Sequence, residues 1–164
     1  MRTIEITKVN LNEIDQLQKI GRQTFQETFS ESNSKENMKS YLEKGFSKEK
    51  LIAELTEKNS EFYFSSIDGE INGYLKINFG DSQTELKDSR ALEIERIYVS
   101  KEFHGKNVGQ LLYDKAIKIA KQKDVEYVWL GVWEENPREI RFYKKNGFIE
   151  YDKYIIKLGD EEQT

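Results

Sequence analysis

The sequence contains no cysteine and a single histidine, His104. Without cysteine the chain can form no disulfide framework, no thiolate zinc site and no cysteine nucleophile. A single histidine also excludes a histidine-based metal cluster, so we predict no metal site. No apolar run approaches the length of a membrane span, and the N-terminal segment lacks the apolar core of a signal peptide. We therefore expect a soluble, cytoplasmic protein without a membrane partner.

The balance of charge excludes another class of partner. The net charge is −4, and residues of both signs are spread along the 164-residue chain. Binding to nucleic acid requires a basic face, so we expect no nucleic acid partner. No linker, internal repeat or low-complexity block divides the sequence. Its length fits a single domain, residues 1–164, with a sizeable core.

The order of the periodic segments predicts an α/β fold with a mixed sheet. After a first strand at residues 3–9, the N-terminal third is predicted to be largely helical, with Ser34 and Ser47 as helix caps. Asp68-Gly69, between two β-rich segments, predicts a hairpin. The rest of the chain predicts a strand at 91–99, a helix at about 108–123, a strand at 126–133, a helix from Asn136-Pro137 to Gly147, and one last strand at 148–158.

Charged and apolar residues are interleaved in the strand at 91–99. Since the side chains of a strand point alternately to its two faces, Ile94, Arg96 and Tyr98 are predicted on one face. The odd-numbered residues from Glu93 to Val99 are predicted on the other.

A basic, glycine-containing turn, HGKNVG, joins this strand to the next helix. The start of a helix offers unpaired N–H groups and the positive end of the macrodipole. Gly105 and Gly109 let the backbone approach a ligand closely, Asn107 tolerates left-handed geometry, and His104 and Lys106 add positive character. The turn therefore suits a phosphate or pyrophosphate, although its spacing matches neither the P-loop nor the dinucleotide-binding pattern. Taken alone, however, so short a glycine pattern favours a polar connection with nothing bound.

A second segment of the sequence changes the interpretation of the turn. VWLGVWEENPREIRFYKKNGF combines an apolar strand, a capped helix start and an aromatic pair followed by Asn-Gly-Phe. Together the two segments resemble the GNAT superfamily of N-acetyltransferases. The resemblance rests on the triplet Ile97-Tyr98-Val99, the loop 104–109, Asn136, and Phe142-Tyr143 with Gly147-Phe148. The segments LEIERIYV, QTFQETF and ENMKSYLE resemble more narrowly the PaiA-type spermidine/spermine acetyltransferases.

The resemblance implies a fold and a co-substrate. The sheet would be mixed and mostly antiparallel, with helices on both faces and a splayed cleft for acetyl-CoA. A β-bulge would open the cleft, so that the backbone of the triplet reaches the pantetheine, while the turn takes the pyrophosphate. The cofactor-binding residues so implied are Ile97, Tyr98, Val99, His104, Gly105, Lys106, Asn107, Val108, Gly109, Gln110, Asn136 and Tyr143.

The resemblance also implies a reaction, the direct transfer of an acetyl group to a primary amine. Glu95, or alternatively Glu93, would take the amine proton through a water, and Tyr143 would protonate the leaving thiolate. Glutamates alternating on a strand are often only a solvated face, and a tyrosine in this place can simply pack. The implied acceptor is a polyamine such as spermidine or spermine, and Glu27, Glu31 and Glu36 are candidates to hold a second ammonium group.

The sequence departs from the family pattern at three places. His104 stands for the usual Gln or Arg, Asn107 stands for the first Gly, and a final family strand is not evident before Thr164. The departures keep two alternatives open, an acetyltransferase for peptide or protein amines and a CoA-binding regulatory module without catalysis. Dimers are common in the family, so a homodimer is one of the partner states to test.

Overall fold

The computed structural model describes residues 3–29, 34–85, 87–131, 137–151 and 154–158. Its strands are β1 (Ile4–Lys8), β2 (Ser60–Ile67), β3 (Glu70–Phe79), β4 (Ala91–Val99), β5 (Tyr127–Gly131), β6 (Ile149–Tyr151) and β7 (Tyr154–Leu158). Its helices are α1 (Ile14–Phe29), α2 (Lys35–Gly45), α3 (Lys48–Leu55), α4 (Val108–Gln122) and α5 (Pro137–Lys145).

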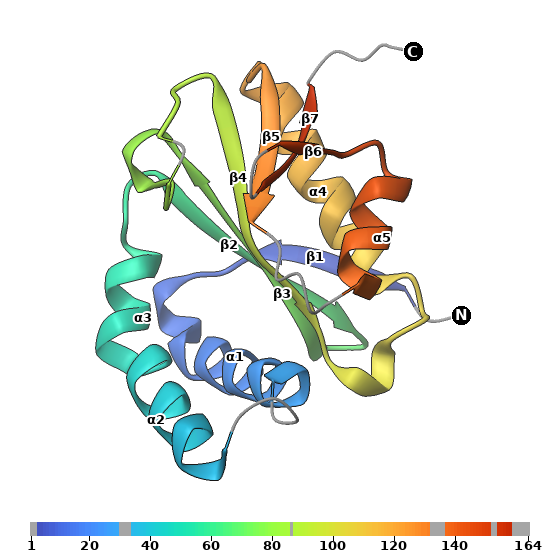
Figure 1. Ribbon diagram of the computed structural model, residues 1–164. Helices are drawn as coiled ribbons and strands as arrows, with labels where there is room; N and C mark the ends of the chain where they lie inside the picture. The colour runs from blue at the N-terminus through green and yellow to red at the C-terminus, as the bar shows by residue number, and fades with distance from the viewer. Residues whose placement is uncertain (1–2, 30–33, 86, 132–136, 152–153, 159–164) are drawn as a thin grey trace.

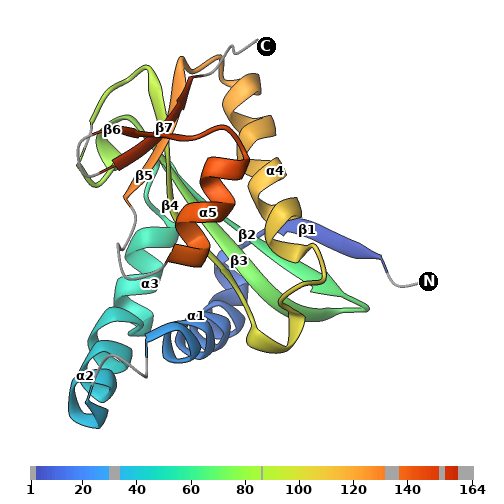
Figure 2. The same cartoon turned by 45° about the vertical axis from the view of Figure 1, so that its right-hand side comes forward.

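The strands form one sheet between two layers of helices. The order in the sheet is β1-β2-β3-β4-β5-β7-β6. Neighbouring strands are antiparallel except β4 and β5, which are parallel. Helices α1, α2 and α3 lie on one side of the sheet, and α4 and α5 lie on the other (Figures 1 and 2). The predicted α/β fold, a mostly antiparallel sheet with helices on both faces, is confirmed.

Several local predictions are confirmed by hydrogen bonds and backbone angles. The Ser34 hydroxyl accepts the Asn37 N–H at the start of α2 (3.1 Å), and the Ser47 hydroxyl caps α3 in the same way. Asp68 and Gly69 have φ of 52° and 84° and connect β2 to β3. These features depend on neighbouring residues in the chain, and the sequence therefore predicts them well.

Alternate residues of the central strands supply two separate apolar clusters. On the α4 and α5 side, Tyr63 and Leu75 belong to a cluster with Leu112. On the α1 and α3 side, Phe64 and Tyr74 belong to the other. The sheet is thus covered on both faces, which explains why its central strands are buried nearly throughout.

The C-terminal segment differs from the prediction. The single strand predicted at 148–158 is two antiparallel strands, β6 and β7, in which Ile149 faces Ile156 and Tyr151 faces Tyr154. β7 then pairs with β5. The sequence analysis counted one strand in this segment, whereas the structure has two. The absence of the final family strand stays a prediction.

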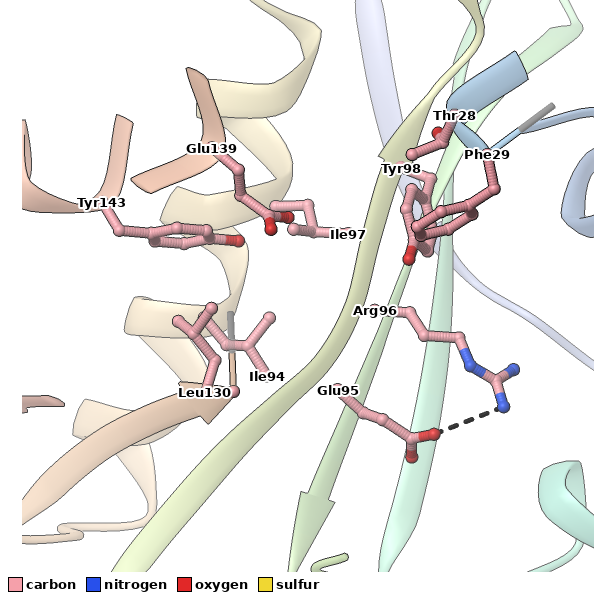
Figure 3. Close-up of a pocket in the computed structure, with 11 residues that line it drawn as sticks. Thr28, Phe29, Ile94, Glu95, Arg96, Ile97, Tyr98, Leu130, Glu139 and Tyr143 are labelled. Carbon is pink, nitrogen blue, oxygen red and sulfur yellow. Dashed lines mark ion pairs between the residues drawn. The ribbon is translucent and has the colours of Figure 1, made fainter. Parts of the chain in front are cut away.

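A β-bulge interrupts the alternation of β4. Lys76 of β3 pairs with Arg96, but the next residue, Ile77, pairs with Ile94, so Glu95 is the extra residue. The strict alternation predicted for 91–99 is therefore wrong across the bulge. Ile94 packs on the α4 side, with Ile97 and Val99 beyond the bulge. Glu95 and Arg96 lie together on the other side of β4 (Figure 3).

Candidate active site

The parallel strands β4 and β5 separate part-way along the sheet. Their pairing covers only residues 91–93 of β4 and 127–129 of β5, whereas β4 runs on beside β3 as far as Val99. From the bulge onward, the edge of β4 away from β3 pairs with no described strand. The splayed arrangement implied by the resemblance is thus present.

The backbone directions show which groups of β4 this open edge presents. The Ser100 N–H donates to a β3 carbonyl (2.8 Å). The Tyr98 carbonyl also faces β3, since a Cβ on Gly73 would lie 2.7 Å from its oxygen. Backbone groups alternate in direction along a strand, so Ile97 and Val99 point their N–H and C=O groups to the open edge. Both residues thus present backbone groups to the open edge, and their contact with the pantetheine stays a prediction.

A pocket of about 110 Å³ spans the open edge of β4. Figure 3 shows its lining on both sides of the strand. Ile94, Ile97, Leu130, Glu139 and Tyr143 lie on the side of α5. The opposite side, toward α1, is lined by Thr28, Phe29, Glu95, Arg96 and Tyr98. A molecule in this pocket can therefore meet groups from both helical layers.

Tyr143 occupies the α5 side of the pocket. Its ring packs edge-on against Tyr113, Phe142 and Phe148, and the side chain is fully buried. Its hydroxyl has no hydrogen-bond partner among the described residues. Burial, and then the charge of Glu139, raise the pKa of Tyr143 well above its ordinary value. The phenol therefore keeps its proton and can donate it inside the pocket.

Glu95 lies on the α1 side and is held by cations. Its carboxylate accepts from Lys76 Nζ (2.6 Å) and Asn78 Nδ2 (2.8 Å), and it pairs with the Arg96 guanidinium at 3.3 Å (Figure 3). Burial acts to raise the pKa of Glu95, but Arg96, Lys76 and Asn78 together lower it below its ordinary value. Glu95 is therefore an ionised carboxylate that lines the pocket and is a weak base.

Glu93 has a different environment from Glu95. It is almost fully buried at the paired part of β4, where its carboxylate accepts from Asn78 Nδ2, Thr84 N and Thr84 Oγ1 at 2.6–2.9 Å. It does not line the pocket. Of the two candidate bases, only Glu95 faces the space where a substrate can bind.

Sequence reasoning missed two parts of the site. The first is an ionic cluster on the α1 side, in which Arg96 donates to Glu54 of α3 at 2.9 Å and Lys76 pairs with Glu95. Lysine and arginine inside buried-looking strands were the available signal. The second is Glu139, whose position four residues before Tyr143 places both on one face of a helix. Burial raises the pKa of Glu139 to about 7.

The turn before α4 has the geometry expected of an anion site. Gly105 and Asn107 have φ of 79° and 70°. The Asn107 side chain makes no capping hydrogen bond to α4, which leaves the first-turn N–H groups to other acceptors. Lys106 is exposed beside them. Gln110 is less available, since its amide donates to Asp114 and Asn146 (3.0 and 3.2 Å).

His104 lies against the open edge of β4 itself. Its Nε2 is 2.8 Å from the Val99 carbonyl oxygen, and because a carbonyl only accepts, Nε2 is the protonated nitrogen in this contact. The other ring nitrogen can donate to a phosphate only in the doubly protonated form. His104 thus connects the turn before α4 to the edge of β4 that is expected to hold the pantetheine.

The remaining predictions concern Asn136, a metal site and a membrane-spanning helix. Asn136 lies outside the described residues, so its predicted contact with the cofactor has no structural counterpart here. Within residues 3–158 as described, no group of three or more His, Cys, Asp or Glu side chains is arranged to hold a metal ion. None of the described helices is both long and apolar enough to cross a membrane.

Comparison with known proteins agrees with this geometry. The model of the acetyltransferase (GNAT) family matches residues 16–148, most of the chain. The chain belongs to this family. It is therefore an acetyl-CoA-dependent N-acetyltransferase, as the resemblance of the two motif segments implied.

Individual relatives of this GNAT acetyltransferase extend over nearly the whole chain. An uncharacterized N-acetyltransferase of Lactobacillus delbrueckii is 37% identical over 100% of this chain and 95% of its own. A spermidine N(1)-acetyltransferase of Thermoplasma acidophilum is 28% identical over 89% and 88%. The crystal structure of the PaiA N-acetyltransferase of that archaeon, in complex with coenzyme A, superimposes with a TM-score of 0.81 at 25% identity, covering 95% of this chain and 99% of that one.

The residues present fit the co-substrate of the family. The open edge of β4 offers the backbone groups of Ile97 and Val99, and the uncapped start of α4 suits a pyrophosphate. A Cβ at Gly105 would meet nothing within 4 Å, so the turn is open to a ligand. The Tyr143 hydroxyl, which has no hydrogen-bond partner among the described residues, points toward β4 in the pocket (Figure 3).

Proposed function

We propose that this GNAT acetyltransferase transfers the acetyl group of acetyl-CoA to a primary amine of a polyamine such as spermidine or spermine. The observation that carries the proposal is the pocket at the open edge of β4. One side holds the unpartnered hydroxyl of Tyr143, and the other holds the carboxylate of Glu95. The spermidine N(1)-acetyltransferase that is 28% identical to this chain supports the choice of acceptor.

The acceptor side of the pocket also presents a carboxylate to a cationic substrate. The buried ionic cluster there pairs two carboxylates, Glu54 and Glu95, with two cations, Lys76 and Arg96, so its formal charge is zero before a substrate binds. An alkyl ammonium group, with a pKa near ~10, is charged at neutral pH. We expect the carboxylate of Glu95, which lines the pocket, to attract this group.

The proposed chemistry uses one group from each side of β4. Acetyl-CoA supplies a thioester whose carbonyl carbon the amine attacks. One ammonium proton first leaves to solvent, which frees the nitrogen lone pair for the attack. Because the pKa of Glu95 is low, Glu95 accepts the second proton through a water as the nitrogen–carbon bond forms, and then passes it to solvent. As the carbon–sulfur bond breaks, the electron pair stays on sulfur and Tyr143 gives its proton to that sulfur. Solvent then restores the phenol.

The proposal is tested by measuring thiol release from acetyl-CoA with spermidine, spermine, a simple monoamine and a lysine peptide. We expect the polyamines to be the fastest acceptors, and Tyr143→Phe to lower kcat by about 10²-fold to 10⁴-fold, the usual effect of a lost general acid. Tyr41→Phe removes the hydroxyl of a tyrosine that is 51% exposed and serves as the control.

The other outcomes of this assay favour the alternatives. Turnover with the lysine peptide alone would favour an acetyltransferase for peptide or protein amines. Binding of acetyl-CoA without turnover of any amine would favour a regulatory module. Full activity of Tyr143→Phe would contradict the role given to this tyrosine while leaving the acceptor assignment intact.

A further inference from the structure

Helix α3 contributes a carboxylate, Glu54, to the acceptor side of β4. Leu51 precedes Glu54 by three residues, so the two side chains share a face of the helix, and Leu51 is buried in the apolar cluster between α3 and the sheet. Glu54 therefore points toward the sheet, where its carboxylate meets side chains of β3 and β4. It does not itself line the pocket. Glu54 thus lies directly behind the residues that an acceptor can touch.

Glu54 shares two cations with Glu95. Arg96 Nη2 is 2.9 Å from Glu54 Oε2 and 3.3 Å from Glu95 Oε2. Lys76 Nζ is 2.6 Å from Glu95 Oε1 and 4.0 Å from Glu54 Oε2. Each cation of the ionic cluster therefore pairs with both carboxylates, and a single oxygen of Glu54 is within ion-pair distance of both cations.

The uncharged polar groups around Glu95 leave this balance unchanged. Asn78 donates to Glu95 (2.8 Å) and to Glu93 (2.9 Å), and so lies between the two carboxylates. Tyr74 of β3 and Tyr98 of β4 also face the cluster. Burial raises the pKa of both phenols, that of Tyr74 to about 12. Near neutral pH, Asn78 and the two phenols therefore add no charge to the ionic cluster.

The negative charge of Glu54 limits how strongly the two cations act on Glu95. Burial acts to raise the pKa of Glu95, and Arg96 and Lys76 lower it below its ordinary value, since a nearby cation favours the ionised form. The charge of Glu54 offsets part of the field of both cations. Without it, both cations would act on Glu95 alone, and the carboxylate would be a weaker base. The cluster would also carry a net positive charge, which repels an ammonium group.

We propose that Glu54 is a positioning residue that acts on Glu95 through Lys76 and Arg96. By pairing with both cations, it leaves the Glu95 carboxylate able to attract the acceptor amine and to take its proton. The bonds made and broken in the transfer are unchanged, and Glu54 exchanges no proton with the acceptor. This inference rests on the proposed function, and in particular on Glu95 as the base.

The kinetics of two variants with opposite effects on charge test the inference. Glu54→Gln keeps the size of the side chain and leaves the cluster with one more cation than carboxylates, whereas Lys76→Gln leaves it with one more carboxylate than cations. We expect Glu54→Gln to lower kcat by about tenfold and to raise the KM of spermidine by about threefold to tenfold, with the KM of acetyl-CoA unchanged. Lys76→Gln should lower the KM of spermidine by a similar factor. Glu49→Gln, at an exposed position in the first turn of α3, is the matched control.

The outcomes separate this inference from the proposed function. A loss of structure would raise the KM of spermidine in both variants, and that result would overturn the inference. Wild-type kinetics of Glu54→Gln would also overturn it, while the acetyltransferase assignment stands. Urea unfolding shows whether each variant is folded under the assay conditions. If Glu54→Gln does not fold, Lys76→Gln decides, because damage to the fold cannot produce the lower KM that is expected.

If wild type turns over no amine, the proposed function fails, and a titration that needs no acceptor decides about Glu54. The isotope-labelled carboxyl carbons of the glutamates are followed by NMR, with the signal of Glu95 assigned through its coupling to the backbone. A Glu95 midpoint that is lower in Glu54→Gln than in wild type, and higher in Lys76→Gln, supports the sharing of the two cations. A midpoint that Glu54→Gln raises or leaves unchanged overturns it.

Discussion

Glu93 and Glu95 are two positions apart on one strand, yet their environments suit different tasks. Glu93 accepts hydrogen bonds from Asn78 and Thr84 and is closed off from the pocket. Glu95, the bulge residue, lines the pocket and is paired with Lys76 and Arg96. The carboxylate of Glu93 thus holds the loop after β3 against β4, whereas that of Glu95 is available to a substrate.

Substitution of each glutamate by glutamine should separate the two tasks. We expect Glu95→Gln to lower kcat by about 10²-fold, because it removes a general base. It should also lower the unfolding free energy by about 3–5 kcal/mol, because it leaves the buried Lys76 ammonium without the carboxylate that it pairs with. Glu93→Gln should lose roughly 1–3 kcal/mol of unfolding free energy, since an amide cannot accept from all three donors. Assays of kcat and urea unfolding on both variants measure this. Loss of turnover in Glu93→Gln alone would reverse the assignment.

At the residue scale, the sequence predicted two residues that line the pocket, Tyr143 and Glu95, but it did not predict their partners. Tyr143 follows from a local motif, and the structure places it at the pocket. The pairing of Glu95 with Arg96 does not follow, because strict alternation assigns adjacent residues to opposite faces. The bulge that brings them together depends on the register with β3, which the sequence does not state. Glu139 was missed because its significance comes from burial beside the pocket.

The strand–turn–helix element at β4 and α4 joins an open strand edge to a helix start that no side chain caps. The bulge and the separation from β5 leave the edge of β4 open. The turn that follows passes through left-handed geometry at Gly105 and Asn107 and leaves the first turn of α4 uncapped by a side chain. Asn107 is the critical residue of the turn, because it takes a conformation that most residues reach only with strain.

Two substitutions at Asn107 test this geometry. Asn107→Gly should keep or slightly raise stability and acetyl-CoA affinity, since glycine adopts a φ of 70° without strain. Asn107→Val should cost about 1–2 kcal/mol and weaken acetyl-CoA binding, because a β-branched residue resists that angle. Urea unfolding and calorimetric titration with acetyl-CoA provide the two readouts. Wild-type values of both for Asn107→Val would show that the turn relaxes without consequence.

Elements that depend on a few adjacent residues were predicted correctly from the sequence. Elements that depend on which strands pair with each other were not. Helix caps and the Asp68-Gly69 hairpin depend on a few adjacent residues, and each is found where expected. The division of residues 148–158 into β6 and β7 depends on which strand each half pairs with. A continuous β-rich run predicts strand but does not locate a reversal inside it.

On the scale of the whole molecule, the open edge of β4 connects the two helical layers. The turn before α4, together with Glu139 and Tyr143 of α5, lies in one layer, and Glu95 faces the other, next to α1 (Figures 2 and 3). Donor and acceptor can therefore enter from opposite faces of the sheet and meet at the pocket. The homodimer expected from the resemblance stays a prediction, which light scattering in solution can check.

The net charge of the protein contributes a long-range electrostatic attraction to the binding of a cationic acceptor. The chain carries −4, and the carboxylate of Glu95 lines the acceptor side of the pocket. Attraction between such a protein and a polycation is screened by salt, and the screening grows with the charge of the ligand. We therefore expect kcat/KM for spermine to fall more steeply than that for a monoamine between about 0.02 M and about 0.3 M salt.

The control is the salt dependence of kcat/KM for acetyl-CoA, measured at saturating amine. Because the pyrophosphate of acetyl-CoA is anionic, this dependence should be flat or opposite in sign. Equal slopes for spermine and the monoamine would mean that a single ammonium group is recognised, and the preference for polyamines would have to come from contacts inside the pocket.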